Sequence, residues 1–333
     1  MGKRFARGRG IRFITPCLFF LLPIFLALPL NSPGSWASYP ERPINMIVCY
    51  APGSGGDFGS RIMADRMSKF LGQPIISVYK PGGGGSLGAS FVAKAKPDGY
   101  TVLVGSATPL ALAPVVKKLD YQIEDFILLG AYAKGLQWLV VKPEARWRTV
   151  KDLVEEAKKS PGKIMAGTFG KLSVSDILRM LLNKHAGIDL VNVPFKSSAE
   201  EITALLGGHI DVAFISSPGA HLESGTIRIL AIAEKERVEA LPHIPTFSEF
   251  GYPVIFTNAY TFCFPKGTPK EIVDRFFDAQ QKAAKQHGEE IKADLKKVEQ
   301  FAIFLSPEET QKTFIDLRET ASRTVKELGI EVK

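Results

Sequence analysis

The 333-residue sequence has little cysteine and no histidine pattern typical of a metal site. Cys17 lies in an N-terminal apolar run, which leaves Cys49 and Cys263 for the rest of the chain. Both lie in apolar, strand-like segments where a thiol packs as a small hydrophobic side chain, although a disulfide between them stays possible in an oxidising compartment. The five histidines show no HExxH spacing, and the cysteines show no zinc-site spacing. We therefore expect no metal and no other cofactor.

Beyond residue 37 the sequence lacks an apolar run long enough to cross a membrane. At the N-terminus, five basic residues precede an apolar segment over residues 13–30. Ser35-Trp36-Ala37 then has small residues at the −3 and −1 positions of a signal peptidase site. This arrangement predicts a signal peptide over residues 1–37, cleaved near Ala37, and a mature protein in the periplasm. An uncleaved N-terminal anchor is the alternative.

A strong excess of one charge is missing as well. The predicted signal peptide carries five basic and no acidic residues, so its removal lowers the formal net charge from +8 to +3. The remaining lysines and arginines are interspersed with aspartates and glutamates. We therefore expect no nucleic acid partner, whereas a slightly basic surface is compatible with a small acidic ligand.

The chain has no internal repeats and no low-complexity tract, and strand-like segments alternate with helix-like segments along most of its length. Such alternation is typical of parallel sheets covered by helices, with ligands at the carboxyl ends of the strands. We predict an α/β fold. The predicted strands cover residues 44–49, 75–79, 101–104, 127–129, 136–141, 164–166, 191–195, 210–215 and 227–233, and the principal predicted helices cover residues 58–71, 149–159, 175–185, 199–206, 270–298 and 306–328.

The most informative loop follows the first predicted strand and has the sequence Ala51-Pro-Gly-Ser-Gly-Gly-Asp57. Its glycines allow bare backbone N–H groups to turn toward a small anion, and the start of the next helix adds a partial positive charge. We predict that Asp57 is the N-cap of that helix. An exported protein with such a loop is predicted to bind a small acidic solute, and a plain strand–helix turn is the alternative.

A second glycine-rich loop, residues 82–88, imitates two enzyme motifs. Gly83-x-Gly85-x-x-Gly88 matches the dinucleotide-binding fingerprint, but the next strand does not end in the acidic residue that would bind a ribose. Gly84-x-Ser86-x-Gly88 matches the nucleophile elbow of hydrolases, but a glycine run separates the strand from the serine. A periplasmic serine hydrolase using Ser86 is therefore kept as an alternative, and a flexible loop is the simplest interpretation. The residues that would complete a triad in a permissible order are Asp211 and either His221 or His243.

Five segments carry a family resemblance and together cover nearly the whole mature chain. They resemble, in order, the sequence blocks of the Bug/TctC family, the periplasmic solute-binding components of tripartite tricarboxylate transporters. The segments are YPERPINMIVCYAPGSGGD, LGQPIISVYKPGGGGSLGASFVAKAKPDGYTVLVGS, VPFKSSAEEITALLGGHIDVAF, GTIRILAIAEKERVEALPHIPTFSEFGYP and FCFPKGTPKEIV.

The resemblance implies a two-domain, periplasmic binding protein-like (type II) architecture with a ligand cleft between the domains. Domain 1 would contain residues 39–140 and 261–333, and domain 2 residues 141–260. The protein would capture a small organic carboxylate, catalyse no reaction, and deliver the ligand to the large and small membrane subunits of the transporter. We expect a monomer. A ligand-sensing module for a membrane signalling partner is an alternative.

Two further loops are expected to face the ligand. Ser106-Ala107-Thr108 follows a buried strand and offers hydroxyl and amide groups. Residues 166–175 connect a strand to a helix in the second half of the chain. By resemblance this second loop is another cradle, in which amides and hydroxyls hold the distal carboxylate.

The chain departs from the family pattern in this second loop. Leu172 stands where glycine is usual, Asp176 stands where histidine is frequent, and Lys171 and Phe169 add a cation and an apolar face. These departures favour a ligand with an aromatic or aliphatic body over a highly charged one such as citrate. Ile215-Ser216 stands where many relatives have Asp-Asn, which makes an amino-acid ligand less expected.

The predicted ligand-binding residues come from these loops and from the end of one more strand. They are Ala51, Gly53, Ser54, Gly55, Gly56, Asp57, Gly84, Gly85, Ser86, Ser106, Ala107, Thr108, Thr168, Phe169, Gly170, Lys171, Ser173, Ser175, Phe195 and Lys196.

Overall fold

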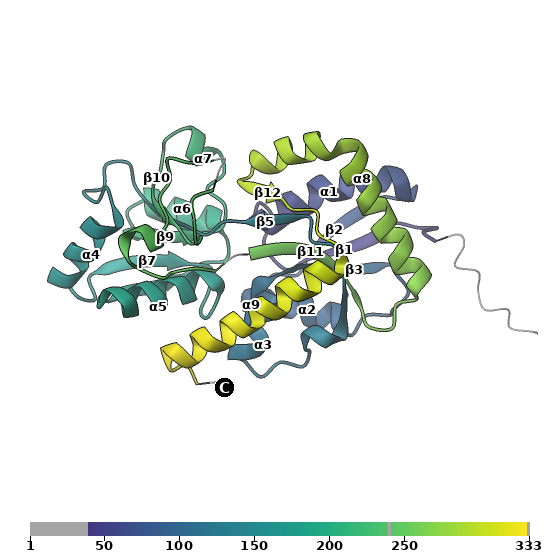
Figure 1. The fold of residues 1–333 in the computed structure, drawn as a ribbon, viewed down its shortest axis with the longest axis horizontal. Coiled ribbons are helices and arrows are strands. Elements are labelled where there is room, and N and C mark those ends of the chain that lie inside the picture. The colour runs from purple at the N-terminus through teal and green to yellow at the C-terminus, as the bar shows by residue number, and fades with distance from the viewer. Residues whose placement is uncertain (1–38, 239–240, 257, 332–333) are drawn as a thin grey trace, which may run out of the picture. The chain divides into compact units, whose positions relative to one another are not determined.

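Two β-sheets with flanking helices make up the part of the chain that the structure, a computed structural model, describes: residues 39–238, 241–256 and 258–331 (Figure 1). This confirms the predicted α/β fold. The predicted signal peptide over residues 1–37 lies outside the described residues. Among those that are described, no helix is long and apolar enough to cross a membrane. We call the sheet that contains residues 44–48 lobe 1 and the sheet that contains residues 164–168 lobe 2, each with its covering helices.

Lobe 1 contains a seven-stranded mixed sheet in the order β12-β5-β11-β3-β1-β2, with β4 also paired to β11. The strands β1, β2 and β3 are parallel, whereas β11 runs antiparallel to β3, β4 and β5. Their bounds are β1 Ile44–Val48, β2 Ile75–Tyr79, β3 Thr101–Ser106, β4 Phe126–Leu128, β5 Ala133–Gly135, β11 Asn258–Pro265 and β12 Gln300–Ala302.

Lobe 2 contains a five-stranded sheet in the order β10-β6-β9-β7-β8. The strand β7 lies between β8 and β9 and is parallel to both, just as β1 lies between β2 and β3 in lobe 1. The bounds are β6 Trp138–Val141, β7 Ile164–Thr168, β8 Leu190–Pro194, β9 Val212–Ile215 and β10 Arg228–Ile232.

The helices follow the strands in the order that the sequence pattern predicts. In lobe 1, α1 packs against α8, and α9 packs against α3 and reaches α5 of lobe 2 (Figure 1). The bounds are α1 Gly55–Leu71, α2 Ser86–Ala93, α3 Ala113–Val116, α4 Val150–Lys159, α5 Val174–Ala186, α6 Ser198–Leu206, α7 Ala220–Glu223, α8 Lys270–Lys296 and α9 Pro307–Leu328.

The chain passes between the two sheets twice, between β5 and β6 and between β10 and β11. Every residue of β11 is buried. Phe262 of this strand stacks on Tyr132 at 4.9 Å between ring centroids and meets Phe276 of α8 edge to face at 5.7 Å. Because a fully buried aromatic side chain contributes about 1.5–3 kcal/mol, this cluster anchors the crossing strand in lobe 1. The domain limits at residues 140 and 261 stay a prediction.

Several local predictions can be compared with the structure. The helix predicted over residues 149–159 corresponds to α4, which begins with a capping box of Thr149 and Asp152. Cys49 and Cys263 are both buried and free, so the disulfide that was left open does not form. The prediction that Asp57 is an N-cap is wrong, because α1 begins at Gly55, three residues earlier than predicted, and its N-cap is Ser54. The glycines that follow Ser54 are therefore helical residues rather than loop.

Candidate ligand-binding site

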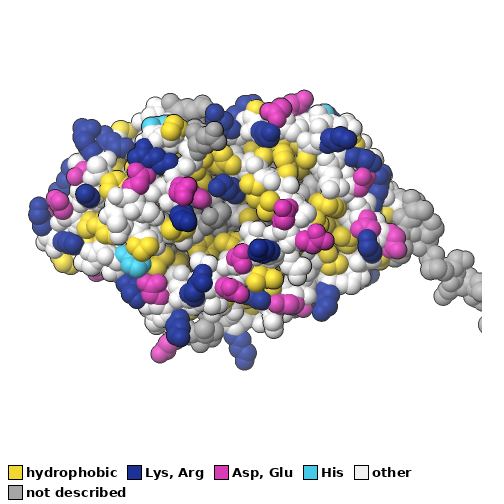
Figure 2. Space-filling model, viewed as in Figure 1, with side chains coloured by type: hydrophobic (Ala, Val, Ile, Leu, Met, Phe, Trp, Pro, Cys, Tyr) yellow, Lys and Arg dark blue, Asp and Glu magenta, His cyan; other side chains and the backbone are white. Residues whose placement is uncertain are grey.

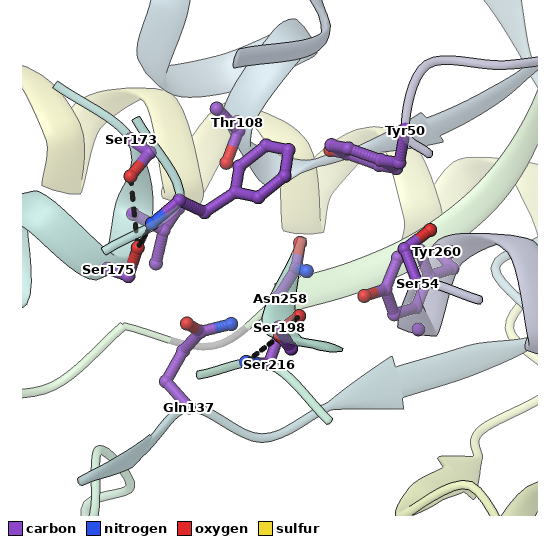
Figure 3. Close-up of a pocket in the computed structure, with 14 residues that line it drawn as sticks. Tyr50, Ser54, Thr108, Gln137, Ser173, Ser175, Ser198, Ser216, Asn258 and Tyr260 are labelled. Atoms are coloured by element: carbon purple, nitrogen blue, oxygen red, sulfur yellow. Dashed lines mark hydrogen bonds between the residues drawn. The ribbon is translucent and has the colours of Figure 1, made fainter. Parts of the chain in front are cut away.

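A narrow cavity lies where the first turns of α1 and α5 face each other (Figure 3). Both lobes contribute to its walls. Its volume is about 30 Å³, room for about two water-sized groups. We call it the inner cavity. Its lining residues are Tyr50, Ser54, Gly55, Gly56, Thr108, Gln137, Phe169, Ser173, Val174, Ser175, Ser198, Ser216, Asn258 and Tyr260.

The α1 side of the inner cavity is held by a capped helix start. The hydroxyl oxygen of Ser54 accepts a hydrogen bond from the Asp57 amide at 3.3 Å. The Asp57 carboxylate in turn accepts from the Gly53 amide at 2.9 Å and from the Tyr79 hydroxyl at 2.9 Å. Gly53 has a φ of 82°, a left-handed conformation that glycine adopts at no steric cost. The carboxylate therefore faces away from the inner cavity and does not repel an anion there.

The α5 side has the same construction with a different sequence. Ser173 accepts from the Asp176 amide at 3.3 Å, and the Asp176 carboxylate accepts from the Leu172 amide at 2.8 Å. Leu172 has a φ of 56°, so a leucine occupies the left-handed position that Gly53 occupies before α1. Asp176 also forms an ion pair with Arg179 at 2.8 Å. The two residues that depart from the family pattern, Leu172 and Asp176, thus rebuild the same cap.

The two helix starts present unsatisfied amides to the same cavity. The N–H groups of Gly55, Gly56, Val174 and Ser175 have no hydrogen-bond acceptor within the described part of the chain, as expected for the first turn of a helix. Each helix N-terminus carries the equivalent of about half a positive charge. None of the 14 residues lining the inner cavity has a charged side chain. Its attraction for an anion therefore comes from backbone dipoles.

Two aromatic side chains, one from each lobe, meet at the inner cavity. Tyr50 of lobe 1 meets Phe169 of lobe 2 edge to face, with 5.3 Å between ring centroids. The Tyr50 hydroxyl is hydrogen-bonded to Ser106. Burial raises the pKa of Tyr50 and of Tyr260 well above the usual value, so both phenols stay neutral. A Cβ at Gly56 would lie 2.8 Å from the Tyr50 ring, which explains the glycine at that position.

Six polar residues of the inner cavity were not predicted from the sequence, and Tyr50 is one of them. Gln137 and Asn258 lie on the two segments that cross between the lobes, and Ser198 and Ser216 are hydrogen-bonded to each other at 3.3 Å (Figure 3). Tyr260 lies on β11. Gln137 and Asn258 interrupt otherwise apolar, buried stretches, and that pattern is the sequence signal that identifies them.

A second, larger pocket of about 410 Å³ adjoins the inner cavity. We call it the outer pocket. Phe169 lines both, and so forms a common wall. The outer pocket is lined by Pro81, Gly82, Gly83, Gly84, Lys117, Phe169, Gly170, Lys171, Phe195 and Lys196.

Twelve of the 20 predicted residues line one of the two pockets, and the other eight line neither. Of the twelve, Ser54, Gly55, Gly56, Thr108, Phe169, Ser173 and Ser175 line the inner cavity, and Gly84, Gly170, Lys171, Phe195 and Lys196 line only the outer pocket. The eight that line neither are Ala51, Gly53, Asp57, Gly85, Ser86, Ser106, Ala107 and Thr168.

Most of these eight residues support the cavity walls through hydrogen bonds. The Ala107 amide donates to the Asn258 side chain at 3.0 Å, and the Thr168 hydroxyl donates to Asn192 at 2.6 Å. The Ser86 hydroxyl donates to the Gly83 carbonyl oxygen at 3.0 Å. Among the described residues, Ser86 has no histidine partner, so the hydrogen-bonded nucleophile and base of a triad are not assembled there. No group of three metal-binding side chains occurs in the described residues either.

Comparison with known proteins identifies the family. The model of the tripartite tricarboxylate transporter family receptor, TctC, matches residues 60–329, well over half of the chain. The chain belongs to this family. It is 31% identical over 250 residues to the UPF0065 protein in the gbd 5' region of Cupriavidus necator, covering 74% of this chain and 75% of that protein. It is 35% identical over 255 residues to a UPF0065 protein of Agrobacterium vitis, with 74% and 73% covered.

Solved structures of TctC and Bug proteins show the same fold. A periplasmic transporter structure has a TM-score of 0.83 at 32% identity and covers 88% of this chain and 99% of its own. Rpa4515 of Rhodopseudomonas palustris with adipate has a TM-score of 0.81 at 27% identity, covering 89% and 100%. MatC of the same organism with bound malate has a TM-score of 0.79 at 25% identity, covering 86% and 100%. The two-domain binding-protein architecture is thus confirmed, and the TctC protein described here is a solute-binding protein.

Proposed function

We propose that this TctC protein captures a small organic carboxylate in the periplasm and delivers it to the large and small membrane subunits of a tripartite tricarboxylate transporter. The observation that carries the proposal is the pair of helix starts facing one cavity. Four of their amides have no acceptor among the described residues, and none of the residues lining the cavity has a charged side chain. Such helix N-termini bind carboxylates through N–H donors and the helix dipole. The similar structures with adipate and malate support the same ligand class.

The proposal includes the parts of the sequence interpretation that concern assembly and location. The signal peptide over residues 1–37 is removed near Ala37, and the mature protein acts as a monomer without catalysing a reaction. Domain 1 contains residues 39–140 and 261–333, and domain 2 contains residues 141–260. Because ligand contacts from both lobes are made together only when the lobes are closed, the carboxylate favours the closed state, which the membrane subunits recognise.

Isothermal titration calorimetry of the exported protein tests the ligand class. We expect adipate or malate to bind, and the bound protein to gain about 2.7 kcal/mol of stability when the free ligand is at a hundred times Kd. Nicotinamide nucleotides should produce no heat, because the strand after the glycine motif of residues 83–88 does not end in the acidic residue that would bind a ribose. If nucleotides or sugars bind and no carboxylate does, the proposal fails.

Three N-cap variants test the location of the site. Ser54→Ala and Ser173→Ala should each cost about 1 kcal/mol of stability, because each removes a side-chain cap. Both should also weaken carboxylate binding by about tenfold, since the uncapped first turn no longer holds its amides toward the cavity. Ser306→Ala is the matched control: it uncaps α9 in the same way, away from the cavity. It should cost the same stability and leave binding unchanged. Equal binding in all three variants would place the site elsewhere.

A further inference from the structure

We propose that the outer pocket is a second anion subsite, which receives the distal negatively charged group of a ligand whose first carboxylate lies in the inner cavity. This inference rests on the proposed function, because it assigns the inner cavity to a carboxylate. It adds the position and the chemistry of the other end of the ligand. The ligand class is then an extended dianion with an apolar body.

The sizes of the two pockets require a ligand that extends out of the inner cavity. At about 30 Å³ the inner cavity has room for about two water-sized groups, which fits the two oxygens of one carboxylate. The outer pocket, at about 410 Å³, has the volume of a small-molecule site. The two adjoin at Phe169, and a Cβ at Gly84 of the outer pocket would lie 3.4 Å from Thr108 of the inner cavity. We therefore place the carbon chain of the ligand along the Phe169 ring, from the inner cavity into the outer pocket.

The charges of the two pockets differ. The outer pocket is lined by three lysines, Lys117, Lys171 and Lys196, and by no acidic residue. Across residues 39–238, 241–256 and 258–331, no carboxylate forms an ion pair with any of the three. Lys117 donates to the Gly83 carbonyl oxygen at 3.3 Å, which holds its ammonium group at the glycine loop. Three cations without carboxylate partners in one pocket attract a second anion.

The walls of the outer pocket suit an apolar ligand body. Phe169 and Phe195 are both partly buried and face the pocket from lobe 2. The opposite wall is the backbone of Gly82, Gly83 and Gly84, whose φ values of 132°, 62° and 70° lie in the region that favours glycine. Side chains are thus excluded from that wall by conformation, which leaves a slot between a bare backbone and two rings.

Matched pairs of mono- and dicarboxylates test the subsite by calorimetry at low salt. Hexanoate and adipate, and octanoate and suberate, differ only in the distal carboxylate. We expect the dicarboxylate of at least one pair to bind about tenfold more tightly than its partner, as three screened charge contacts allow. The triple variant Lys117→Gln, Lys171→Gln, Lys196→Gln should remove this advantage, because it weakens dicarboxylate binding by about ten times more than it weakens monocarboxylate binding.

A control variant separates the pocket from net charge. The triple variant Lys151→Gln, Lys158→Gln, Lys159→Gln alters three exposed lysines of α4 that line neither pocket, with the same change in net charge. It should keep the dicarboxylate advantage, and raising the salt concentration should reduce that advantage in wild type.

Each other result would overturn the inference. An advantage that survives in the pocket variant would place the distal carboxylate elsewhere. Equal binding of both members of every pair would reject the subsite and leave the proposed function standing. The absence of binding by any carboxylate would reject both.

Discussion

The first turns of α1 and α5 are built by the same local bonds from different residues. In each, a serine N-cap accepts from an aspartate amide three residues on, and the aspartate carboxylate reaches back to an amide in a left-handed residue. Before α1 the left-handed residue is Gly53, and before α5 it is Leu172. The backbone arrangement is therefore the shared feature, and sequence identity is not needed to produce it.

The surroundings of the two helix starts differ. On the α1 side, Gly56 lies against the Tyr50 ring, and Gly55 has the Tyr260 hydroxyl nearby. On the α5 side, Val174 and Ser175 carry side chains, and the Ser175 hydroxyl oxygen accepts from the Phe169 amide at 2.8 Å. The α1 start thus depends on close packing of backbone against rings, whereas the α5 start depends on side-chain hydrogen bonds. The following changes test that contrast.

The largest expected difference is in the stability lost when each aspartate, Asp57 or Asp176, is replaced by alanine. Arg179, the partner of Asp176, has a side chain only 12% exposed, whereas Arg61, the partner of Asp57, is 49% exposed. Asp176→Ala leaves a nearly buried guanidinium unpaired and should cost about 3–5 kcal/mol in urea unfolding. Asp57→Ala should cost about 2 kcal/mol, because Arg61 is rehydrated and only hydrogen bonds are lost. Equal costs would contradict this account of the two caps.

A third acidic residue, Glu201, is buried without an ion-pair partner of the kind that Asp57 and Asp176 have among the described residues. Glu201 of α6 is fully buried, and neither carboxyl oxygen has a hydrogen-bond partner among the described residues. Burial raises the pKa of Glu201 well above its usual 4.5, and Glu200 adds to the shift. The folded state therefore keeps a proton that the unfolded state loses. Stability is fully present below about pH 4.5 and falls as the pH rises from there through the folded pKa.

The measurement is the free energy of unfolding between pH 5 and pH 8. Wild type should lose stability with a slope of at most about 1.4 kcal/mol per pH unit from this group. Glu201→Gln should lose that component of the slope, whereas Glu155→Gln, on the exposed face of α4, should follow wild type. Parallel curves for all three proteins would show that Glu201 titrates normally.

A smaller difference in stability is expected between substitutions at the second residue of each helix, Gly56 in α1 and Ser175 in α5. Gly56→Ala places a Cβ 2.8 Å from a Tyr50 ring that is itself held by Ser106. Overpacking should destabilise the protein by about 1–3 kcal/mol. Replacing a glycine by alanine inside a helix stabilises it by only about 0.5–1 kcal/mol, so the variant should be less stable than wild type. Ser175→Ala removes one hydrogen bond to Phe169, about 1 kcal/mol. Calorimetry should show that Gly56→Ala also weakens carboxylate binding more than Ser175→Ala does. The reverse order would mean that the α5 side is the more constrained one.

The fold was predictable because strand and helix periods alternate clearly and because caps have local signatures. The predicted helices over residues 149–159 and 306–328 are confirmed, and each begins with a capping box. Residues such as Gln300, whose side chain donates to the Gly55 carbonyl oxygen, could not be predicted from the sequence, because the bond joins positions 245 residues apart. The short strands β5 and β12 were missed for the same reason, since each is defined by its partners.

The site was predictable only in part, because its local motif is not specific. The serine- or threonine-capped start with an acidic residue three positions on also occurs in α4, α6 and α9. What distinguishes α1 and α5 is that each follows the central strand of its parallel group, β1 or β7. That position brings them to facing strand ends, and it depends on sheet order, which local sequence patterns do not give. The cap of α1 was placed on Asp57 because both Ser54 and Asp57 are good N-cap residues.

The smallest effect isolates the left-handed position itself. At Gly53 no atom lies within 4 Å of an added Cβ, so Gly53→Ala tests conformation without a clash. The free energy of unfolding should fall by about 1 kcal/mol. This is the steric cost of alanine in a left-handed conformation, less the stability gained because alanine reduces the entropy of the unfolded chain. Leu172→Gly should likewise be about 1 kcal/mol more stable than Leu172→Ala, because both lose the same leucine packing and only alanine keeps the strain at a φ of 56°. Equal stability of the two Leu172 variants would show that the α5 cap does not require this backbone conformation, and the equivalence of the two helix starts would be lost.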